Sequence, residues 1–296
     1  MGAMTTIEGI TFNDKQWFME AAFPGLRRCK RDVFKIDQEI FKGKSRFQDI
    51  HIFKSRGFGR MLALDGIIQF SENDEFIYHE IIAHVPLLSH KNPKKFLVVG
   101  GGDGGVLREA AKHPLKELYH VEIDKEIVAL SKKYLSFVSK GVFSDKRLNA
   151  CFEDGIKFIK RYKDFFDVIV VDSTDPVGPG KVLFEKDFYR LIFSALKKDG
   201  LAIFQLGPFL DFDLIIRPTA KKLQSFFTVV RPVRLAMPSY SCGCEYCFMI
   251  ASKEVDPAKI GSAILSRRLK QRLGPKASSL KYYTPQIHQA SLAMPK

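Results

Sequence analysis

The sequence predicts an α/β protein in which a doubly wound, mostly parallel sheet follows a small antiparallel β domain. From residue 96 onward, short apolar runs typical of buried strands alternate with segments of helical periodicity, as in parallel sheets with helical crossovers. One run, Val168-Ile169-Val170-Val171, is wholly β-branched and apolar, which indicates a central strand buried on both faces. Residues 31–70 hold strand-like runs without intervening helices, which predicts antiparallel pairing there.

The N-terminal β domain is expected over residues 1–70. Its strand-like runs are residues 31–36, 47–53, 60–64 and 67–70. The dipeptide Asp65-Gly66 separates the last two runs and is a strong signal for a two-residue hairpin turn, because both residue types tolerate positive φ. The first 25 residues have a mixed pattern, in which Trp17 and Phe18 are candidates for a lid or a subunit contact.

The second domain, residues 71–296, is expected to begin with a helix. Ser71-Glu72-Asn73-Asp74 supplies a capping-box start, and the helix should run from residue 75 to 85, where Pro86 stops it. Further strands are expected at residues 96–99, 118–123, 149–153, 168–171, 201–205, 229–235 and 246–251. Further helices are expected at residues 106–113, 125–135, 155–162, 184–196 and 217–227.

Bulk composition indicates a globular protein of the cytoplasm. The chain has 296 residues, of which 46% are hydrophobic and 27% charged, as in ordinary soluble domains. Its longest apolar runs are too short to span a bilayer, and the first residues lack the basic and apolar segments of a secretory signal. The five cysteines, an odd number at positions 29, 151, 242, 244 and 247, predict neither a disulfide framework nor a metal site.

The net charge of +14 could indicate nucleic-acid binding. The basic residues are spread along the chain, however, and the densest group, Arg267-Arg268-Leu269-Lys270-Gln271-Arg272, lies in a helical segment without interleaved aromatic residues. A solvated helix face explains that group better than an RNA platform, so we expect neither a nucleic-acid nor a membrane partner.

A glycine-rich loop, residues 100–105 (Gly-Gly-Gly-Asp-Gly-Gly), follows an expected strand and opens an expected helix. This context is typical of nucleotide binding, and Glu122 stands about twenty residues further on, where an acid holds ribose hydroxyls. Asp103 within the loop argues against NAD, because a carboxylate would repel its pyrophosphate. An adenosyl sulfonium compound, which is cationic at that point, fits better.

Two carboxylates, Asp172 and Asp175, follow the buried strand at residues 168–171. Ligands of open α/β sheets bind outside the carboxyl ends of the strands, so these acids would form an electronegative mouth suited to a cation. Alternatively, Asp175 caps a turn before Pro176 and Asp172 caps a loop.

Several motifs together resemble those of the polyamine aminopropyltransferases, the spermidine synthase family, in family order from about residue 15 to the C-terminus. The motifs are Phe47-Gln48-Asp49, Leu64-Asp65-Gly66, residues 74–80 (Asp-Glu-Phe-Ile-Tyr-His-Glu), the glycine loop, Val121-Glu122-Ile123-Asp124, Glu153-Asp154-Gly155, residues 172–179, Leu183-Phe184, Phe188-Tyr189, Met237-Pro238-Ser239-Tyr240 and Lys281-Tyr282-Tyr283.

The resemblance implies a Rossmann-like fold of the adenosylmethionine-dependent transferase type. It implies transfer of an aminopropyl group from decarboxylated S-adenosylmethionine, a co-substrate, to putrescine, which gives spermidine and 5'-methylthioadenosine. It also implies a homodimer or homotetramer, and no resident cofactor or metal. Asp172 would be the general base, with Tyr78 orienting the amine. The donor contacts would be Gln48, His79, Gly101, Asp103, Glu122, Asp154 and Gly155, and the acceptor contacts Asp175, Gln205 and Tyr240.

The chain departs from the family pattern on the acceptor side. Leu206-Gly207-Pro208-Phe209 stands where relatives usually carry an acid or polar group. The loop after Tyr240 continues as Ser241-Cys242-Gly243-Cys244-Glu245-Tyr246, where many relatives place a large apolar residue. Cadaverine, agmatine and spermidine therefore stay open as acceptors beside putrescine. Two other readings are methyl transfer from ordinary adenosylmethionine and a non-enzymatic binding module. The paired acids beside Tyr78 favour the aminopropyl reaction.

Overall fold

The computed structural model describes residues 4–7, 10–13, 16–21, 32–173, 182–240 and 245–294. The chain divides into two compact units. The first unit is Met1–Glu75 with Met237–Gly243, and the second is Phe76–Ala236 with Cys244–Lys296. The segment Met237–Gly243 therefore belongs to the first unit, although it lies far along the chain from the rest of that unit. Within the described residues, every helix is too short or too polar to cross a membrane.

The first unit contains a four-stranded antiparallel sheet. Its strands, in spatial order, are β5 (Gln38–Lys44), β6 (Asp49–Ser55), β7 (Gly59–Leu64) and β8 (Ile67–Ser71). Two further antiparallel pairs join β1 (Met4–Ile7) to β2 (Ile10–Asn13) and β3 (Trp17–Met19) to β4 (Val33–Lys35). The expected hairpin is confirmed, because Leu64 pairs with Ile67 and the two turn residues have φ of 49° and 79°.

Phe18 is part of the apolar core of the first unit. It is 8% exposed and packs with Phe34, Phe53 and Met61, and its ring centroid lies 5.0 Å from that of Phe53. The expectation that Phe18 serves as a lid or a subunit contact is therefore wrong. An aromatic residue in a short strand satisfies its hydrophobicity inside the unit, which a mixed local pattern did not reveal.

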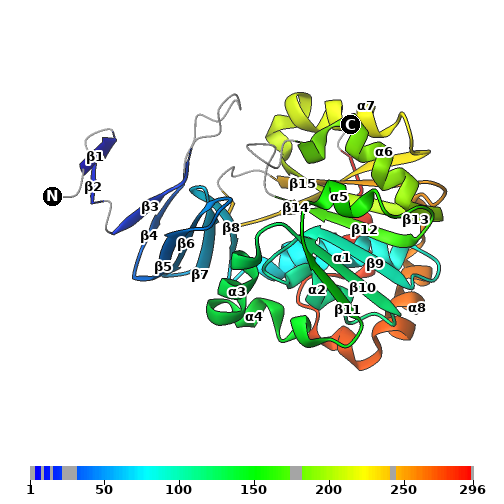
Figure 1. Cartoon of the computed structure of the whole chain (residues 1–296), viewed down its shortest axis with the longest axis horizontal. Helices are drawn as coiled ribbons and strands as arrows, with labels where there is room; N and C mark the ends of the chain where they lie inside the picture. Colours follow the sequence, from blue (N-terminus) through cyan, green and yellow to red (C-terminus); the bar gives the residue numbers. More distant parts are fainter. Residues whose placement is uncertain are drawn as a thin grey trace. The chain divides into compact units, whose positions relative to one another are not determined.

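The second unit contains a seven-stranded sheet in the order β11-β10-β9-β12-β13-β15-β14 (Figure 1). Its strands are β9 (Lys95–Gly100), β10 (Glu117–Glu122), β11 (Leu148–Phe152), β12 (Phe166–Asp172), β13 (Leu196–Pro208), β14 (Val229–Ala236) and β15 (Glu245–Ser252). Pairings from β11 to β13 are parallel, and β15 pairs antiparallel with both β13 and β14. The predicted doubly wound, mostly parallel sheet is confirmed.

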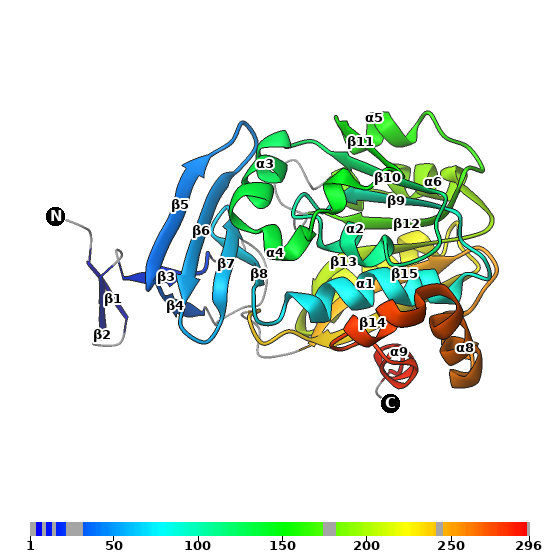
Figure 2. The same ribbon diagram turned by 90° about the horizontal axis from the view of Figure 1, so that it is seen from below.

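Helices cover both faces of this sheet (Figure 2). The helices are α1 (Glu75–Ser89), α2 (Gly105–Ala110), α3 (Lys125–Tyr134), α4 (Ser136–Ser139), α5 (Gly155–Ile159), α6 (Lys186–Ala195), α7 (Arg217–Leu223), α8 (Ser262–Leu273) and α9 (Pro285–Ser291). Side chains of α5, α6 and α7 pack on the sheet face that carries Leu97, Ile169 and Phe204. Because successive strand residues alternate in direction, the other face takes α1 and α8.

Helix α1 continues past Pro86 to Ser89, so the expectation that this proline ends it is wrong. Proline at position 86 removes the amide that would donate to the Ile82 carbonyl, and the turn beyond it is stabilised at its end, where the last carbonyl groups of α1 receive donors from another helix. Arg272 Nη1 donates to the Leu87 carbonyl, and Arg268 Nη1 donates to those of Leu88 and Ser89 at 2.7 and 2.8 Å. These two members of the basic group on α8 therefore cap a helix.

Strand β13 is longer than expected and contains a bulge. It continues through Leu206-Gly207-Pro208, and its register with β15 shifts between Gln205 and Gly207. Gly207 has φ of +149°, which a side chain would disfavour. The bulge changes the direction of the strand directly after Gln205, at the carboxyl edge of the sheet.

Candidate active site

The glycine loop joins β9 to α2 and is tied to the end of β12. The Gly101 amide donates to the Asp172 carbonyl at 2.9 Å, and Gly100 and Gly101 have φ of +84° and +65°. A Cβ on Gly100 would lie 2.1 Å from the Asp172 carbonyl oxygen, and one on Gly101 3.1 Å from Asp172 Oδ2. Glycine is thus required at these positions because the loop backbone approaches Asp172 closely. Close approach of a ligand to the loop would be a second reason.

His79 and Asp103 meet where α2 begins. His79 Nε2 lies 3.3 Å from Asp103 Oδ1, which also accepts the Gly105 amide at 2.6 Å. Burial by itself would raise the pKa of Asp103, yet the His79 imidazole and the Gly105 amide hold it below the ordinary value. A Cβ on Gly105 would fall 2.4 Å from the His79 ring, so only glycine leaves room for that imidazole.

Asp172 ends β12 and receives the hydroxyl of Tyr78 from α1. The Tyr78 hydroxyl donates to Asp172 Oδ1 at 2.6 Å. Burial, followed by the nearby Asp103 carboxylate, raises the pKa of Asp172 to about 6, against the opposing hydrogen bond from Tyr78. Two carboxylates at one sheet edge therefore differ, with Asp103 ionised and Asp172 a stronger base than an ordinary aspartate.

Glu122 lies at the end of β10, beside the glycine loop. A Cβ on Gly102 would lie 3.2 Å from its Oε2, while its Oε1 accepts the Asp124 amide at 2.9 Å. Burial raises the pKa of Glu122 to about 7. Glu122 is only 9% exposed, so its carboxyl group has little contact with water. A ligand that offers hydroxyl or cationic groups would stabilise this carboxyl by hydrogen bonds or charge.

Asp154 and Gly155 begin α5, which follows β11. Asp154 Oδ1 accepts the amides of Ile156 and Lys157 at 2.7 and 3.1 Å, so this residue caps the helix. A Cβ on Gly155 would lie 2.8 Å from Val99 Cγ1 on β9. Each residue thus has a local reason for its identity, besides the donor contact that the resemblance implies.

Gln205 lies on β13 and meets Tyr246 on β15. Gln205 Nε2 donates to the Tyr246 hydroxyl at 2.5 Å, and both side chains are buried. The Tyr246 and Tyr78 rings lie 6.0 Å apart between centroids, and both pack on Phe248. The aromatic group links Gln205 to the tyrosine that holds Asp172.

Two predicted site residues belong to the first unit, and a third is not among the described residues. Gln48 and Tyr240 belong to the first unit. Gln48 closes a turn in which the Ser45 amide donates to the Gln48 carbonyl and the Gln48 amide donates to Ser45 Oγ. The Tyr240 hydroxyl donates to the Gln69 carbonyl at 2.7 Å. Asp175 lies outside the described residues. Their expected roles stay predictions.

Sequence reasoning missed the roles of Glu80, Gly105 and Tyr246. Glu80 accepts three backbone amides of residues 281–283. A charged residue within an otherwise buried helix was the available signal for Glu80. Gly105 belongs to the loop expected to bind a nucleotide, and its close contact with His79 has no local sequence signal. The Tyr246 contact depends on the register of β13 with β15, which the sequence does not fix.

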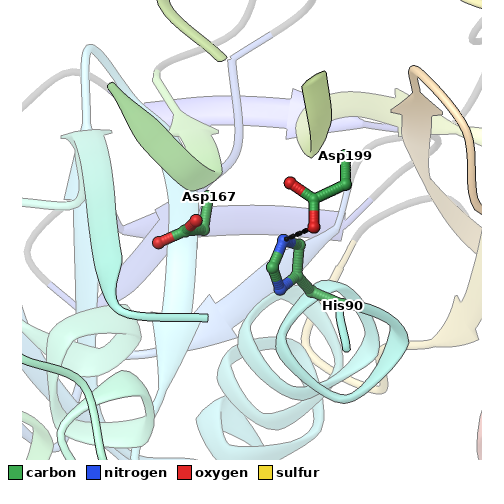
Figure 3. Close-up of side chains that lie close together, drawn as sticks. All are labelled: His90, Asp167 and Asp199. Atoms are coloured by element: carbon green, nitrogen blue, oxygen red, sulfur yellow. Dashed lines mark ion pairs between the residues drawn. The ribbon is translucent and has the colours of Figure 1, made fainter. Parts of the chain in front are cut away.

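One group in the described part of the chain has the spacing of metal ligands, namely His90, Asp167 and Asp199 (Figure 3). His90 Nε2 lies 3.3 Å from Asp199 Oδ2. Asp167 Oδ2 accepts the Lys94 and Lys95 amides, and its Oδ1 pairs with Lys197 Nζ at 2.8 Å. A cation would have to displace this lysine, so the donor set does not fit a metal and we assign none.

Fold and site together define a Rossmann-like α/β protein whose glycine loop and half-buried acids meet at the carboxyl edge of the sheet. Residues 75–259 match the spermine/spermidine synthase domain, and residues 16–72 match the spermidine synthase tetramerisation domain.

The curated relatives include a polyamine aminopropyltransferase of Caldicellulosiruptor saccharolyticus, 43% identical over 94% of this chain and 95% of that protein. A polyamine aminopropyltransferase of Pectobacterium carotovorum is 40% identical over 89% of this chain and 90% of that one.

Two solved structures are similar in fold. A crystal structure of spermidine synthase in complex with the transition-state analogue AdoDATO has a TM-score of 0.84 and 35% identity, covering 94% of this chain and 92% of the other. Spermidine synthase from Thermotoga maritima has a TM-score of 0.82 and 33% identity over 95% and 92%. The chain therefore belongs to the spermine/spermidine synthase family and is by kinship a polyamine aminopropyltransferase.

Proposed function

We propose that this enzyme transfers the aminopropyl group of decarboxylated S-adenosylmethionine to putrescine, giving spermidine and 5'-methylthioadenosine. The observation that carries the proposal is a pair of half-buried carboxylates at the carboxyl edge of the sheet, Asp103 with His79 Nε2 at 3.3 Å and Asp172 with the Tyr78 hydroxyl at 2.6 Å. The pKa of Asp103 lies below the ordinary range and that of Asp172 above it. Both substrates are cations, and the decarboxylated donor lacks the carboxylate that Asp103 would repel. The names of the relatives and of the similar structures support the same reaction.

On the donor side, Asp103 would hold the aminopropyl ammonium, with His79 fixing the Asp103 carboxylate. Glu122 would accept the ribose hydroxyls, and Gly101 would let the ligand approach the loop backbone. The contacts of Asp154 and Gly155 with the adenine end, and that of Gln48, complete the set implied by the resemblance. Decarboxylated S-adenosylmethionine acts here as a co-substrate, and the proposed reaction uses no resident cofactor.

On the acceptor side, an alkyl amine has a pKa near ~10 and is protonated at neutral pH, so it needs a base before it can attack. Asp172 would take that proton, and its raised pKa makes the transfer less unfavourable than to an ordinary aspartate. The free amine then attacks the carbon beside the sulfonium. The carbon–sulfur bond breaks in line, and its electron pair neutralises the sulfur in methylthioadenosine.

Tyr78 would orient both Asp172 and the attacking amine, while Gln205, Tyr240 and Asp175 would receive the rest of the acceptor. Holding the two substrates in line supplies much of the rate gain, because a bimolecular step becomes effectively unimolecular. Putrescine is the proposed acceptor, and cadaverine, agmatine and spermidine are the alternatives for a competition assay.

Calorimetric titration with decarboxylated and with ordinary S-adenosylmethionine tests the proposal. We expect tighter binding of the decarboxylated compound, because Asp103 would repel the carboxylate of the ordinary one. Preference for ordinary S-adenosylmethionine would favour a methyltransferase instead. A panel of amines with mass identification of the products then assigns the acceptor, and a preferred amine other than putrescine would overturn that part.

We also propose a homodimer or homotetramer assembled through the N-terminal part. The match of residues 16–72 to a tetramerisation domain supports this, and the sheet of the first unit has β5 and β8 as its edge strands. Sedimentation equilibrium distinguishes the two states, and a monomer at micromolar concentration would contradict both.

A further inference from the structure

Glu80 is a buried carboxylate that the proposed reaction does not use. Its side chain is 2% exposed and accepts three backbone amides. Oε1 accepts from Lys281 at 2.8 Å, and Oε2 accepts from Tyr282 and Tyr283 at 2.9 and 2.7 Å. Three hydrogen bonds to one carboxyl group therefore attach α1 to a segment that lies 201 to 203 positions further along the chain.

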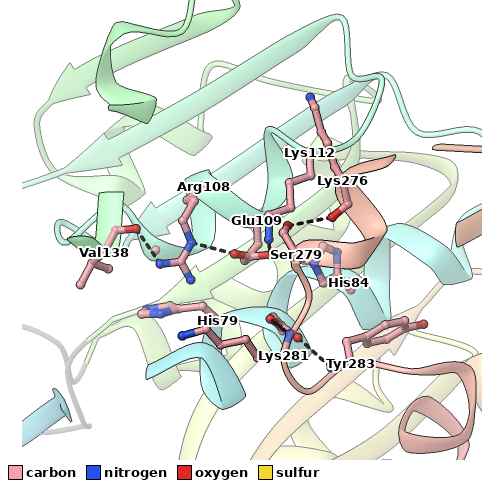
Figure 4. Close-up of polar contacts among 12 residues, drawn as sticks. His79, His84, Arg108, Glu109, Lys112, Val138, Lys276, Ser279, Lys281 and Tyr283 are labelled. Carbon is pink, nitrogen blue, oxygen red and sulfur yellow. Dashed lines mark hydrogen bonds and ion pairs between the residues drawn. The ribbon is translucent and has the colours of Figure 1, made fainter. Parts of the chain in front are cut away.

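The C-terminal segment, residues 262–292, also holds α1 further along its length (Figure 4). The Tyr283 ring lies 5.4 Å from that of His84, and the Tyr283 hydroxyl contacts His288 Nδ1 at 2.8 Å. Arg268 and Arg272 on α8 cap the last carbonyl groups of α1. The helix is thus attached to one segment near both of its ends.

Glu80 and Tyr78 project from nearly opposite sides of α1. Residues two apart in an α-helix are separated by roughly 200° about its axis, given 3.6 residues per turn. Tyr78 therefore reaches the carboxyl edge of the sheet, where it holds Asp172, while Glu80 reaches the C-terminal segment. An attachment on the far side fixes the rotation of the first turns, and a small rotation is amplified at the tip of a long tyrosine.

We propose that Glu80 is a positioning residue for aminopropyl transfer: docking of residues 281–283 on its carboxylate sets the orientation of Tyr78 and thereby holds the hydrogen bond to Asp172. The expected effect on kcat rests on the proposed function. The expected effect on the hydrogen bond between Tyr78 and Asp172 rests on the fold alone. The titratable and charged groups that interact with Asp172 are Tyr78, His79, Asp103 and Glu122, and Glu80 acts through the first of them.

Two variants test the attachment from its two sides. Glu80→Gln keeps the shape but replaces one acceptor oxygen with a donor. Lys281→Pro removes one donating amide without altering α1, and Leu280 before it already has the extended ψ of 134° that proline favours. The matched control is Arg272→Met, which removes contacts with the other end of α1.

We expect both test variants to lower kcat at pH 6 by roughly tenfold and to move the acidic limb of the pH profile upward, the same direction that we expect for Tyr78→Phe. In the Tyr78→Phe background, Glu80→Gln should change kcat less than about twofold, because it acts through the same hydroxyl. Arg272→Met should lower the melting temperature without moving the limb. The proposal would be overturned if the kcat losses of Tyr78→Phe and Glu80→Gln multiplied in the double variant. It would also be overturned if the acidic limb stayed in place in both test variants.

A crystal structure of Glu80→Gln gives a readout that is independent of the reaction. The Tyr78 to Asp172 distance should lengthen beyond hydrogen-bond range, whereas an unchanged distance would contradict the inference. If the wild-type enzyme made no aminopropylated product, the proposed function would be wrong. The Tyr78 to Asp172 distance in the Glu80→Gln crystal structure would still test the inference.

Discussion

The hydroxyl of Tyr78 donates a 2.6 Å hydrogen bond to the carboxylate of Asp172, 94 positions away in the sequence. It joins the first turns of α1 to the carboxyl end of the central strand β12. The bond favours the ionised carboxylate, whereas burial and Asp103 favour the protonated one and prevail, so the pKa is about 6. Asp172 is therefore both ionised at neutral pH and more basic than a surface aspartate.

Replacing Tyr78 with Phe should raise the pKa of Asp172 further, because the ionised form loses a hydrogen bond. A bond to a charged group contributes about 1.5–3 kcal/mol, so the acidic limb of kcat/KM should move upward by about one pH unit or more. Activity should then fall more at pH 6 than at pH 8. A loss of the same size at both pH values would mean that Tyr78 does not act on this carboxyl.

Replacing Asp172 with Asn should abolish the base while keeping the shape of the side chain. We expect kcat to fall by roughly 10²–10⁴-fold with nearly unchanged donor affinity, measured by steady-state kinetics and calorimetry. Asp199→Asn is the matched control, since that half-exposed side chain pairs with His90 and lies at the start of β13. Parallel loss of donor affinity would show that Asp172 mainly binds the donor.

Binding of the cationic donor should release protons near pH 6.5. Asp172 and Glu122 have pKa values raised to about 6 and about 7, chiefly by burial, so both are partly protonated there in the free enzyme. A bound cation favours their ionised forms and lowers both pKa values. Calorimetry in two buffers of different ionisation enthalpy measures the release, which should vanish near pH 9. Proton uptake on binding at pH 6.5 would contradict these values.

Adding a methyl group at Gly105 should weaken donor binding. A Cβ there would lie 2.4 Å from the His79 ring, so the imidazole must leave Asp103. We expect Gly105→Ala to reduce donor affinity by about tenfold or more, equivalent to about 1.4 kcal/mol. Gly261→Ala is the control, because nothing lies within 4 Å of a Cβ at Gly261. Equal donor affinities in the two variants would argue against a binding role for His79 and Asp103.

The sequence predicted those features that depend on local pattern. The all-apolar run of β12, the alternation of strands and helices and the Asp65-Gly66 hairpin are local, and each is confirmed. The glycine loop also follows its strand and opens its helix as expected.

Features that depend on distant partners were not predictable. Pro86 lies inside α1, and the carbonyl groups of Leu88 and Ser89 beyond it accept hydrogen bonds from Arg268, about 180 positions away. Ser239 joins the first unit because its amide and hydroxyl donate to Asp74 at 2.7 and 3.0 Å, 165 positions away. The two partners of such a pair lie far apart in the sequence, so no local sequence pattern indicates the contact and only the fold reveals it.

The identity of the reaction products tests the central claim most directly. The enzyme would be incubated with putrescine and either decarboxylated or ordinary S-adenosylmethionine, and the products identified by mass. The decarboxylated donor should give spermidine and 5'-methylthioadenosine in equal amounts, and the ordinary donor should give almost none. Formation of a methylated amine and S-adenosylhomocysteine from the ordinary donor, without spermidine from the decarboxylated one, would contradict aminopropyl transfer.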